Sequence, residues 1–140
     1  MKQFNASQKL DSQQMLPLIL LVDDEPNILK SLKRLLRGKP FNLVTATTAR
    51  EALTILAENE VQVMLTDHKM PNMTGAQLID IVHQQHPNIV SIMLSGQVDY
   101  DHVIRLLNDR LITRFIKKPW CGDELVATIE KAVTKYEENN

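Results

Sequence analysis

The sequence has very little of what builds disulfide-bonded, membrane-spanning or strongly charged proteins. Its 140 residues include one cysteine, Cys121, so no internal disulfide is possible and a reducing cytoplasm is the simplest compartment. No apolar run approaches the roughly 20 residues that a bilayer-spanning helix needs. The net charge of −1 argues against nucleic acid binding as the main role. We therefore expect a cytoplasmic protein that makes no direct contact with membranes or nucleic acid.

The chain divides into a polar beginning and a long globular part. Residues 1–15 are rich in Gln, Ser and Asn and lack the apolar segment of a secretory signal, so we interpret them as a loosely packed N-terminal extension. Residues 16–137 have the length for one domain with a sizeable core, and a short tail follows at 138–140. The apolar share of 44% and the charged share of 24% are ordinary for a globular domain.

Strand-like and helix-like segments alternate at short intervals throughout the globular part. Such alternation predicts βαβ units, and hence an α/β fold with a doubly wound, five-stranded parallel sheet and five helices on both faces. Asp24 or Glu25 is the expected cap of the first helix, and Thr47 or Thr48 of the second. The predicted strands are residues 18–22, 42–46, 61–66, 89–94 and 113–116, and the predicted helices are 26–37, 49–58, 75–85, 99–108 and 122–137.

Acidic side chains follow two of the predicted strands directly. Asp23 and Asp24 come after the first strand, and Asp67 comes after the third. The carboxyl ends of parallel strands share one edge, where open α/β sheets bind their ligands. Three carboxylates at that edge repel one another, so a positive charge should compensate them. Mg²⁺ (or Mn²⁺) is the natural candidate because it takes oxygen ligands, and Lys118 at the end of the fifth strand is a second.

An aspartate in this position has a specific chemical use. A carboxylate such as that of Asp67 can act as a nucleophile and become an aspartyl-phosphate. Phosphoryl transfer requires alignment of donor and acceptor and positive charge around the phosphoryl oxygens. The groups available for these tasks are Asp23 and Asp24 for the metal, Lys118 and the Ser95 hydroxyl for the phosphoryl oxygens, and Gly96, which leaves room for the group to enter.

Each of these residues also has a purely structural interpretation. Asp23 and Asp24 are good helix caps, and Asp67 can begin an Asx-turn. Lys118 can be a surface lysine, and Ser95 an ordinary loop hydroxyl. The functional interpretation is favoured because the four features follow four different predicted strands at the same edge of the sheet.

Taken together, the motifs resemble those of the receiver domain of two-component response regulators. That resemblance implies a flavodoxin-like sheet with the strand order 2-1-3-4-5. It covers about Leu16–Tyr136, and its matching segments are Leu21–Pro26, Thr66–Asp67 with Met70–Pro71 and Gly75, Leu94–Gly96, and Phe115–Pro119.

The resemblance implies a role for each acidic residue. Asp67 is expected to be the phosphorylated residue. Asp24, Asp67 and the backbone carbonyl of Lys69 are expected to ligate the metal, with Asp23 acting mostly through metal-bound water. The Lys69 side chain lies at a variable position of the family and is expected to tune the phosphate lifetime, in a direction that the sequence does not give. His68 is expected to be peripheral, because Mg²⁺ prefers oxygen.

The resemblance also implies a switch. Lys118, which directly precedes Pro119, is expected to contact the phosphoryl group, and the bond between them is expected to be cis. Ser95 and Phe115 form the expected switch pair, whose two states phosphorylation would bias. Phe115 has no hydroxyl, so apolar burial alone would drive its inward movement.

The implied function is signalling without turnover of a separate metabolite. A histidine kinase or phosphotransfer protein is expected to phosphorylate Asp67, and the domain would catalyse only its own phosphorylation and dephosphorylation. The signal would leave through the predicted helix 99–108, strand 113–116 and helix 122–137, toward an output domain or a second receiver in a homodimer. The segment Arg114–Trp120 resembles a subgroup followed by cyclic-dinucleotide phosphodiesterase, cyclase or transcriptional domains. The chain is then either a stand-alone receiver or one domain of a longer protein, and this resemblance favours the second.

Two other functions fit parts of the pattern. An Mg²⁺-dependent phosphohydrolase with an Asp nucleophile uses a similar sheet, but such enzymes place a general-acid Asp where this chain has Lys69. A scaffold that has lost phosphorylation is the other alternative. The intact set of acidic, hydroxyl and lysine residues argues against it.

Overall fold

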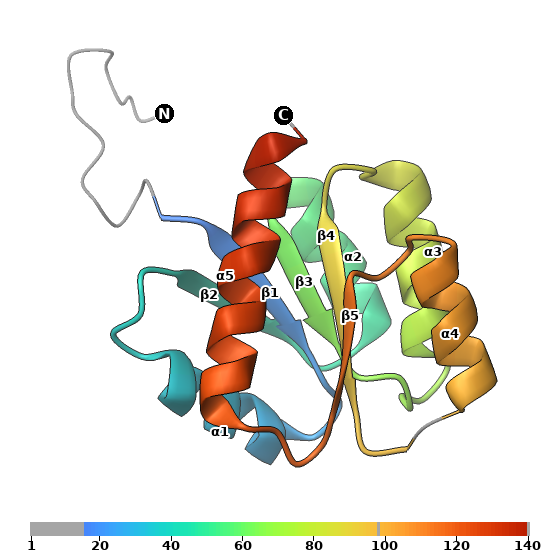
Figure 1. The fold of residues 1–140 in the computed structure, drawn as a ribbon, viewed down its shortest axis with the longest axis horizontal. Helices are drawn as coiled ribbons and strands as arrows, with labels where there is room; N and C mark the ends of the chain where they lie inside the picture. The colour runs from blue at the N-terminus through green and yellow to red at the C-terminus, as the bar shows by residue number, and fades with distance from the viewer. Residues whose placement is uncertain (1–15, 98, 140) are drawn as a thin grey trace.

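The computed structural model describes residues 16–97 and 99–139, so the extension predicted for residues 1–15 lies outside the described residues. Within these ranges, five strands alternate with five helices (Figure 1). The strands are β1 (Leu18–Val22), β2 (Asn42–Ala46), β3 (Val63–Thr66), β4 (Val90–Ser95) and β5 (Arg114–Lys117). The helices are α1 (Pro26–Leu36), α2 (Ala49–Glu58), α3 (Gly75–Gln85), α4 (Tyr100–Asn108) and α5 (Gly122–Glu138).

The strands form one parallel sheet in the order β2-β1-β3-β4-β5, which confirms the predicted fold. Alternate residues of each strand point to opposite faces, so the sheet has a core on each side. Helices α1 and α5 cover one face, packing on residues such as Ile19 and Leu65. Helices α2, α3 and α4 cover the other, packing on residues such as Leu20 and Met64 (Figure 1). None of the described helices has the length and hydropathy of a bilayer span.

The main differences from the predicted elements lie at strand and helix ends. Ser95 was expected to begin a loop, but it is the last residue of β4, where it lies opposite Lys117 of β5. Strand ends depend on pairing with the neighbouring strand, which the local sequence does not reveal. Thr48 caps α2 as expected, by accepting a hydrogen bond from the Glu51 amide. Glu25 is the N-cap residue of α1, but its side chain makes no capping hydrogen bond.

Candidate functional site

The sheet order brings the acidic residues together. β1 and β3 are neighbours, with Val22 opposite Thr66, so the residues that follow these two are adjacent. The Asp67 amide continues the ladder by donating a hydrogen bond of 2.9 Å to the Val22 carbonyl. Carboxylate oxygens of Asp23, Asp24 and Asp67 all lie within 4.8 Å of one another. The structure therefore places these three predicted site residues in one cluster at the carboxyl edge of the sheet.

A lysine from the far edge of the sheet reaches the same cluster. Lys118 follows β5, and its Nζ donates a hydrogen bond of 2.7 Å to Asp23 Oδ2. The same Nζ lies 3.5 Å from Asp67 Oδ2. The Lys118 amide is held by the Ser95 carbonyl at 2.9 Å, and the bond between Lys118 and Pro119 is cis. A single ammonium group thus bridges two carboxylates.

Burial and hydrogen bonding shift the pKa values of Asp23 and Lys118 in opposite directions. Burial raises the pKa of Asp23 above its ordinary value, and the nearby Asp67 carboxylate acts in the same direction. The hydrogen bonds from Lys118 and from the Glu25 amide only partly oppose this rise. Burial alone would lower the pKa of Lys118, but its hydrogen bond to Asp23 and the charges of Asp23 and Asp67 raise it overall. The ammonium form of Lys118 is therefore strongly favoured.

The carboxylate oxygens of the cluster differ in how many hydrogen bonds they accept. Asp23 Oδ1 accepts a hydrogen bond from the Glu25 amide at 2.9 Å, and its Oδ2 accepts the one from Lys118. Asp67 Oδ1 accepts a hydrogen bond of 2.8 Å from the His68 amide, so Oδ2 is its less engaged oxygen. The Asp24 carboxylate makes no hydrogen bond or ion pair with any of the described residues. Asp24 and Asp67 thus hold the oxygens most available to a ligand.

The composition of the cluster suits a hard divalent cation. Three carboxylates face one ammonium, which leaves an excess of negative charge when all are ionised. Asp23 and Asp67 are buried and Asp24 is half-buried, so water screens this charge weakly. All three side chains offer oxygen, the donor that Mg²⁺ and Mn²⁺ prefer. The residues present therefore fit such an ion.

Ser95 lies at the same edge but is turned toward its own loop. The side chain is buried, with 1% exposed. Its hydroxyl donates a hydrogen bond of 3.1 Å to the Gln97 carbonyl and accepts one of 3.4 Å from the Gln97 amide. Phe115 on β5 is half-buried and packs against the core on the face covered by α2, α3 and α4. Gly96 is open: a Cβ there would lie 3.7 Å from Lys118 Cβ, an ordinary contact.

Two features of the Asp67 loop were missed from the sequence. A Cβ on Gly75 would collide with the Asp67 carbonyl, and the Gly75 amide donates to the His68 carbonyl at 2.7 Å. His68 contacts the ring of His102 on α4 edge to face, with centroids 5.3 Å apart. Burial lowers the pKa of His68, and the charge of His102 adds to this effect. Pro and Gly residues such as those of this loop are typical of a turn, but nothing in the local sequence indicates these long-range contacts.

Comparison with known proteins bears directly on this site. The family model of the response regulator receiver domain matches residues 19–130. The chain belongs to this family. The resemblance inferred from the motifs is therefore confirmed. Receiver domains are phosphoacceptor signalling domains, and phosphorylation and Mg²⁺ are general features of the family.

Two regulatory proteins illustrate the sequence relationship. The hydrogenase transcriptional regulatory protein HoxA of Cupriavidus necator is 36% identical over 115 residues, which cover 82% of this chain and 24% of the relative. The DNA-binding transcriptional regulator NtrC of Escherichia coli is 31% identical over 121 residues, which cover 86% of this chain and 26% of the relative. The chain thus spans about a quarter of the length of these curated relatives.

Solved structures agree with the fold. A signal receiver domain of an HD domain-containing protein from Pseudomonas fluorescens superimposes with a TM-score of 0.84 and 34% identity, covering 88% of this chain and 98% of that one. A CheY-like receiver domain from Methanospirillum hungatei gives a TM-score of 0.83 and 29% identity, covering 89% of this chain and 99% of that one. These comparisons support no phosphohydrolase function.

Proposed function

We propose that Asp67 accepts a phosphoryl group from the phosphohistidine of a histidine kinase or phosphotransfer protein, in a reaction that requires Mg²⁺ or Mn²⁺. The observation that carries the proposal is the cluster of three carboxylates within 4.8 Å of one another, two of them bridged by Lys118 Nζ at 2.7 and 3.5 Å. Positive groups beside a buried acceptor carboxylate are what phosphoryl transfer requires.

In this proposal, the Asp24 and Asp67 carboxylates and the backbone carbonyl of Lys69 would hold the metal, and Asp23 would act mostly through a water molecule bound to it. This division is supported by the hydrogen bonds, because both Asp23 oxygens already accept one whereas the Asp24 carboxylate accepts none from the described residues. The bound ion would neutralise the acidic cluster and the charge on the transferred phosphoryl group.

The transfer itself forms one bond and breaks another. Asp67 Oδ2, the less engaged oxygen, forms the new O–P bond. The N–P bond of the donor breaks, and its electron pair stays on the imidazole nitrogen, which takes a proton. Lys118, rather than the exposed Lys117, contacts a phosphoryl oxygen, and Gly96 leaves the entrance open. Attack of water on the phosphorus later breaks the O–P bond to Asp67, releases inorganic phosphate and restores the Asp67 carboxylate, so the domain limits its own phosphorylated lifetime.

The conformational response passes through Ser95 and Phe115. The Ser95 hydroxyl exchanges its hydrogen bonds with Gln97 for one to a phosphoryl oxygen, which vacates space beside β4. The half-buried Phe115 ring then moves inward, driven by apolar burial because it has no hydroxyl to bond. Phosphorylation shifts the two-state equilibrium because it binds one arrangement better than the other.

The signal leaves through α4, β5 and α5. Three large side chains at helical spacing on α4 support this: Tyr100 is 63% exposed, Ile104 51% and Leu107 38%. Residues 16–137 act in the cytoplasm as the receiver domain, and the partner on this surface is an output domain or a second receiver. The match of this chain to one quarter of HoxA and NtrC supports a transcriptional output elsewhere in the assembly.

The test is phosphorylation by acetyl phosphate, or binding of beryllofluoride, with and without Mg²⁺. Trp120 is the fluorescent reporter, since it is half-buried against the core two residues after Lys118. We expect a fluorescence change that requires Mg²⁺ and disappears in Asp67→Asn. Asp80→Asn, which removes an exposed carboxylate from α3, is the matched control and should respond like the wild type. A response that survives Asp67→Asn would assign the acceptor to another residue.

A further inference from the structure

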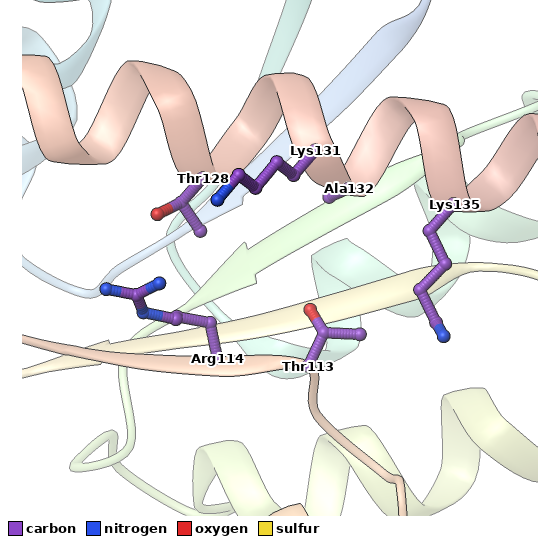
Figure 2. Close-up of a pocket in the computed structure, with 6 residues that line it drawn as sticks. All are labelled: Thr113, Arg114, Thr128, Lys131, Ala132 and Lys135. Atoms are coloured by element: carbon purple, nitrogen blue, oxygen red, sulfur yellow. The ribbon is translucent and has the colours of Figure 1, made fainter.

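A basic groove lies between the start of β5 and the second half of α5, away from the acidic cluster. Figure 2 shows its central hollow, of about 150 Å³, with Thr113 and Arg114 on one side and Thr128, Lys131 and Lys135 on the other. A second hollow of about 330 Å³ adjoins it and shares Thr113 and Lys135. We use the name basic groove for the surface formed by Leu107, Arg110, Thr113, Arg114, Lys131 and Lys135.

The groove belongs to the opposite end of the sheet from Asp67. Thr113 precedes β5, whereas Lys118 follows it, and five residues of extended chain span about 16 Å. Helix α5 runs antiparallel to the strands, so its second half, which contains Lys131 and Lys135, lies toward the same amino edge (Figure 1). The groove therefore takes no part in holding the phosphoryl group.

Charge is strongly segregated in the groove. The chain as a whole has 17 acidic and 16 basic residues, but no Asp or Glu lines either hollow. Arg114 is paired with Glu124 at the rim, at 2.8 Å. Arg110, Lys131 and Lys135 have no hydrogen bond or ion pair from their side chains to any residue in the described ranges. Three cations thus face one groove without a counter-charge.

The position of Arg110 supports a role for its side chain. Its φ is 61°, in the left-handed region where Gly or Asn usually closes a helix, and it follows the end of α4. A basic side chain on an edge strand also prevents pairing with other sheets. That explanation applies to Arg114 on β5 but not to Lys131 and Lys135, which lie one turn apart on a helix.

We infer that the basic groove binds an acidic segment of a partner polypeptide, which carries at least two carboxylates and one apolar side chain. The unpaired cations supply the charge complementarity. Lys131 lines one hollow and Arg110 lines the other, so an extended chain that crosses both hollows can contact both cations, whereas a ligand confined to one hollow cannot. Leu107, 38% exposed, lines the second hollow and offers an apolar contact that a nucleic acid backbone would not use. Binding of the acidic segment does not depend on the proposed function. Only a role of this binding in signalling rests on the proposal that the signal leaves through α4, β5 and α5.

Fluorescence anisotropy of the full chain with a labelled ten-residue peptide of alternating Glu and Leu tests this inference. The double variant Lys131→Gln/Lys135→Gln should bind the peptide about fivefold more weakly, as expected for the loss of two exposed charge pairs. The matched variant Lys30→Gln/Lys33→Gln removes two exposed lysines from α1 and should bind like the wild type. A peptide with Gln in place of Glu should bind more weakly than the acidic one.

Several outcomes would overturn the inference. If the two double variants lost the same amount of peptide affinity, the attraction would be unspecific. If the Gln peptide bound as tightly as the Glu peptide, the carboxylates would have no role. Tighter binding of a 12-base-pair DNA duplex would assign the groove to nucleic acid, and a dimer abolished by Lys131→Gln/Lys135→Gln would assign it to a second copy. Asp67→Asn should still bind the peptide, so failure of the proposed phosphorylation and failure of this inference are separately visible.

Discussion

Lys118 offers the sharpest perturbation of the acidic cluster. Lys118→Met keeps an unbranched side chain of nearly the same length but removes the ammonium group that lies 2.7 Å from Asp23 Oδ2 and 3.5 Å from Asp67 Oδ2. The exposed fractions of the three side chains are 14%, 2% and 7%, so water cannot fully replace the lost partner. The variant therefore leaves two buried carboxylates facing each other without a counter-charge.

The expected cost follows from this burial. Removing one partner of a buried ion pair destabilises a protein by about 3–5 kcal/mol when the remaining charge is fully enclosed. Lys118 is partly exposed, which reduces the expected loss for Lys118→Met to about 2–3 kcal/mol near neutral pH. Mg²⁺ at about 100 times its dissociation constant should restore about 2.7 kcal/mol, since it binds only the folded cluster. The same variant should bind Mg²⁺ more tightly than the wild type, because no ammonium competes with the ion.

Urea unfolding in EDTA and in excess Mg²⁺ measures both effects. Lys117→Met is the matched control, because this neighbouring lysine is exposed on β5, and it should change the free energy of unfolding by less than about 0.5 kcal/mol. Asp23→Asn combined with Lys118→Met should recover at least half of the loss, since one unpaired carboxylate is gone. An unchanged stability of Lys118→Met in EDTA, or no recovery in the double variant, would refute the reasoning.

Two further predictions concern the same edge of the sheet. Gly75→Ala places a Cβ against the Asp67 carbonyl and should destabilise the protein by about 1–3 kcal/mol, although Ala normally favours a helix. Gly96→Ala is the control and should be tolerated, because a Cβ at that position makes only an ordinary contact. Equal effects of the two substitutions in thermal unfolding would contradict this prediction. Burial raises the pKa of Asp23 above 3.8, so the native state binds this proton at higher pH than the unfolded chain does. The Asp23 contribution to stability without Mg²⁺ is therefore fully present below 3.8 and is lost as the pH rises through the folded pKa. Asp23→Asn should lack this pH dependence in urea titrations, and an unaltered profile would show that another group causes it.

The sequence predicted the chemistry of the site better than its geometry. Apolar runs followed by Asp23, Asp67 and Lys118 mark the ends of three strands, and the parallel arrangement then requires those ends to share an edge. The prediction needed no knowledge of side-chain contacts. What it left open is how one ammonium divides between two carboxylates, since this depends on atoms 95 residues apart in the chain.

The local sequence pattern also failed to predict features that depend on contacts with other segments of the chain. Ser95 follows an apolar run and was expected in a loop, but pairing with β5 includes it in β4. The sequence gives no local reason for a glycine at position 75, because the group that leaves no room for a Cβ there is the Asp67 carbonyl, eight residues earlier. The contact between His68 and His102 joins the Asp67 loop to α4, two segments that no sequence periodicity connects.

By itself, the sequence determined the alternating elements, the two-faced core and the identity of the acidic, hydroxyl and lysine residues, because periodicity and residue type are local properties. Only the tertiary structure decided that one lysine serves two aspartates and that Arg110, Lys131 and Lys135 line adjoining hollows. These contacts depend on the crossover connections and on the packing of helices against the sheet. Both bring together residues that are far apart in the chain, so the local sequence does not reveal them.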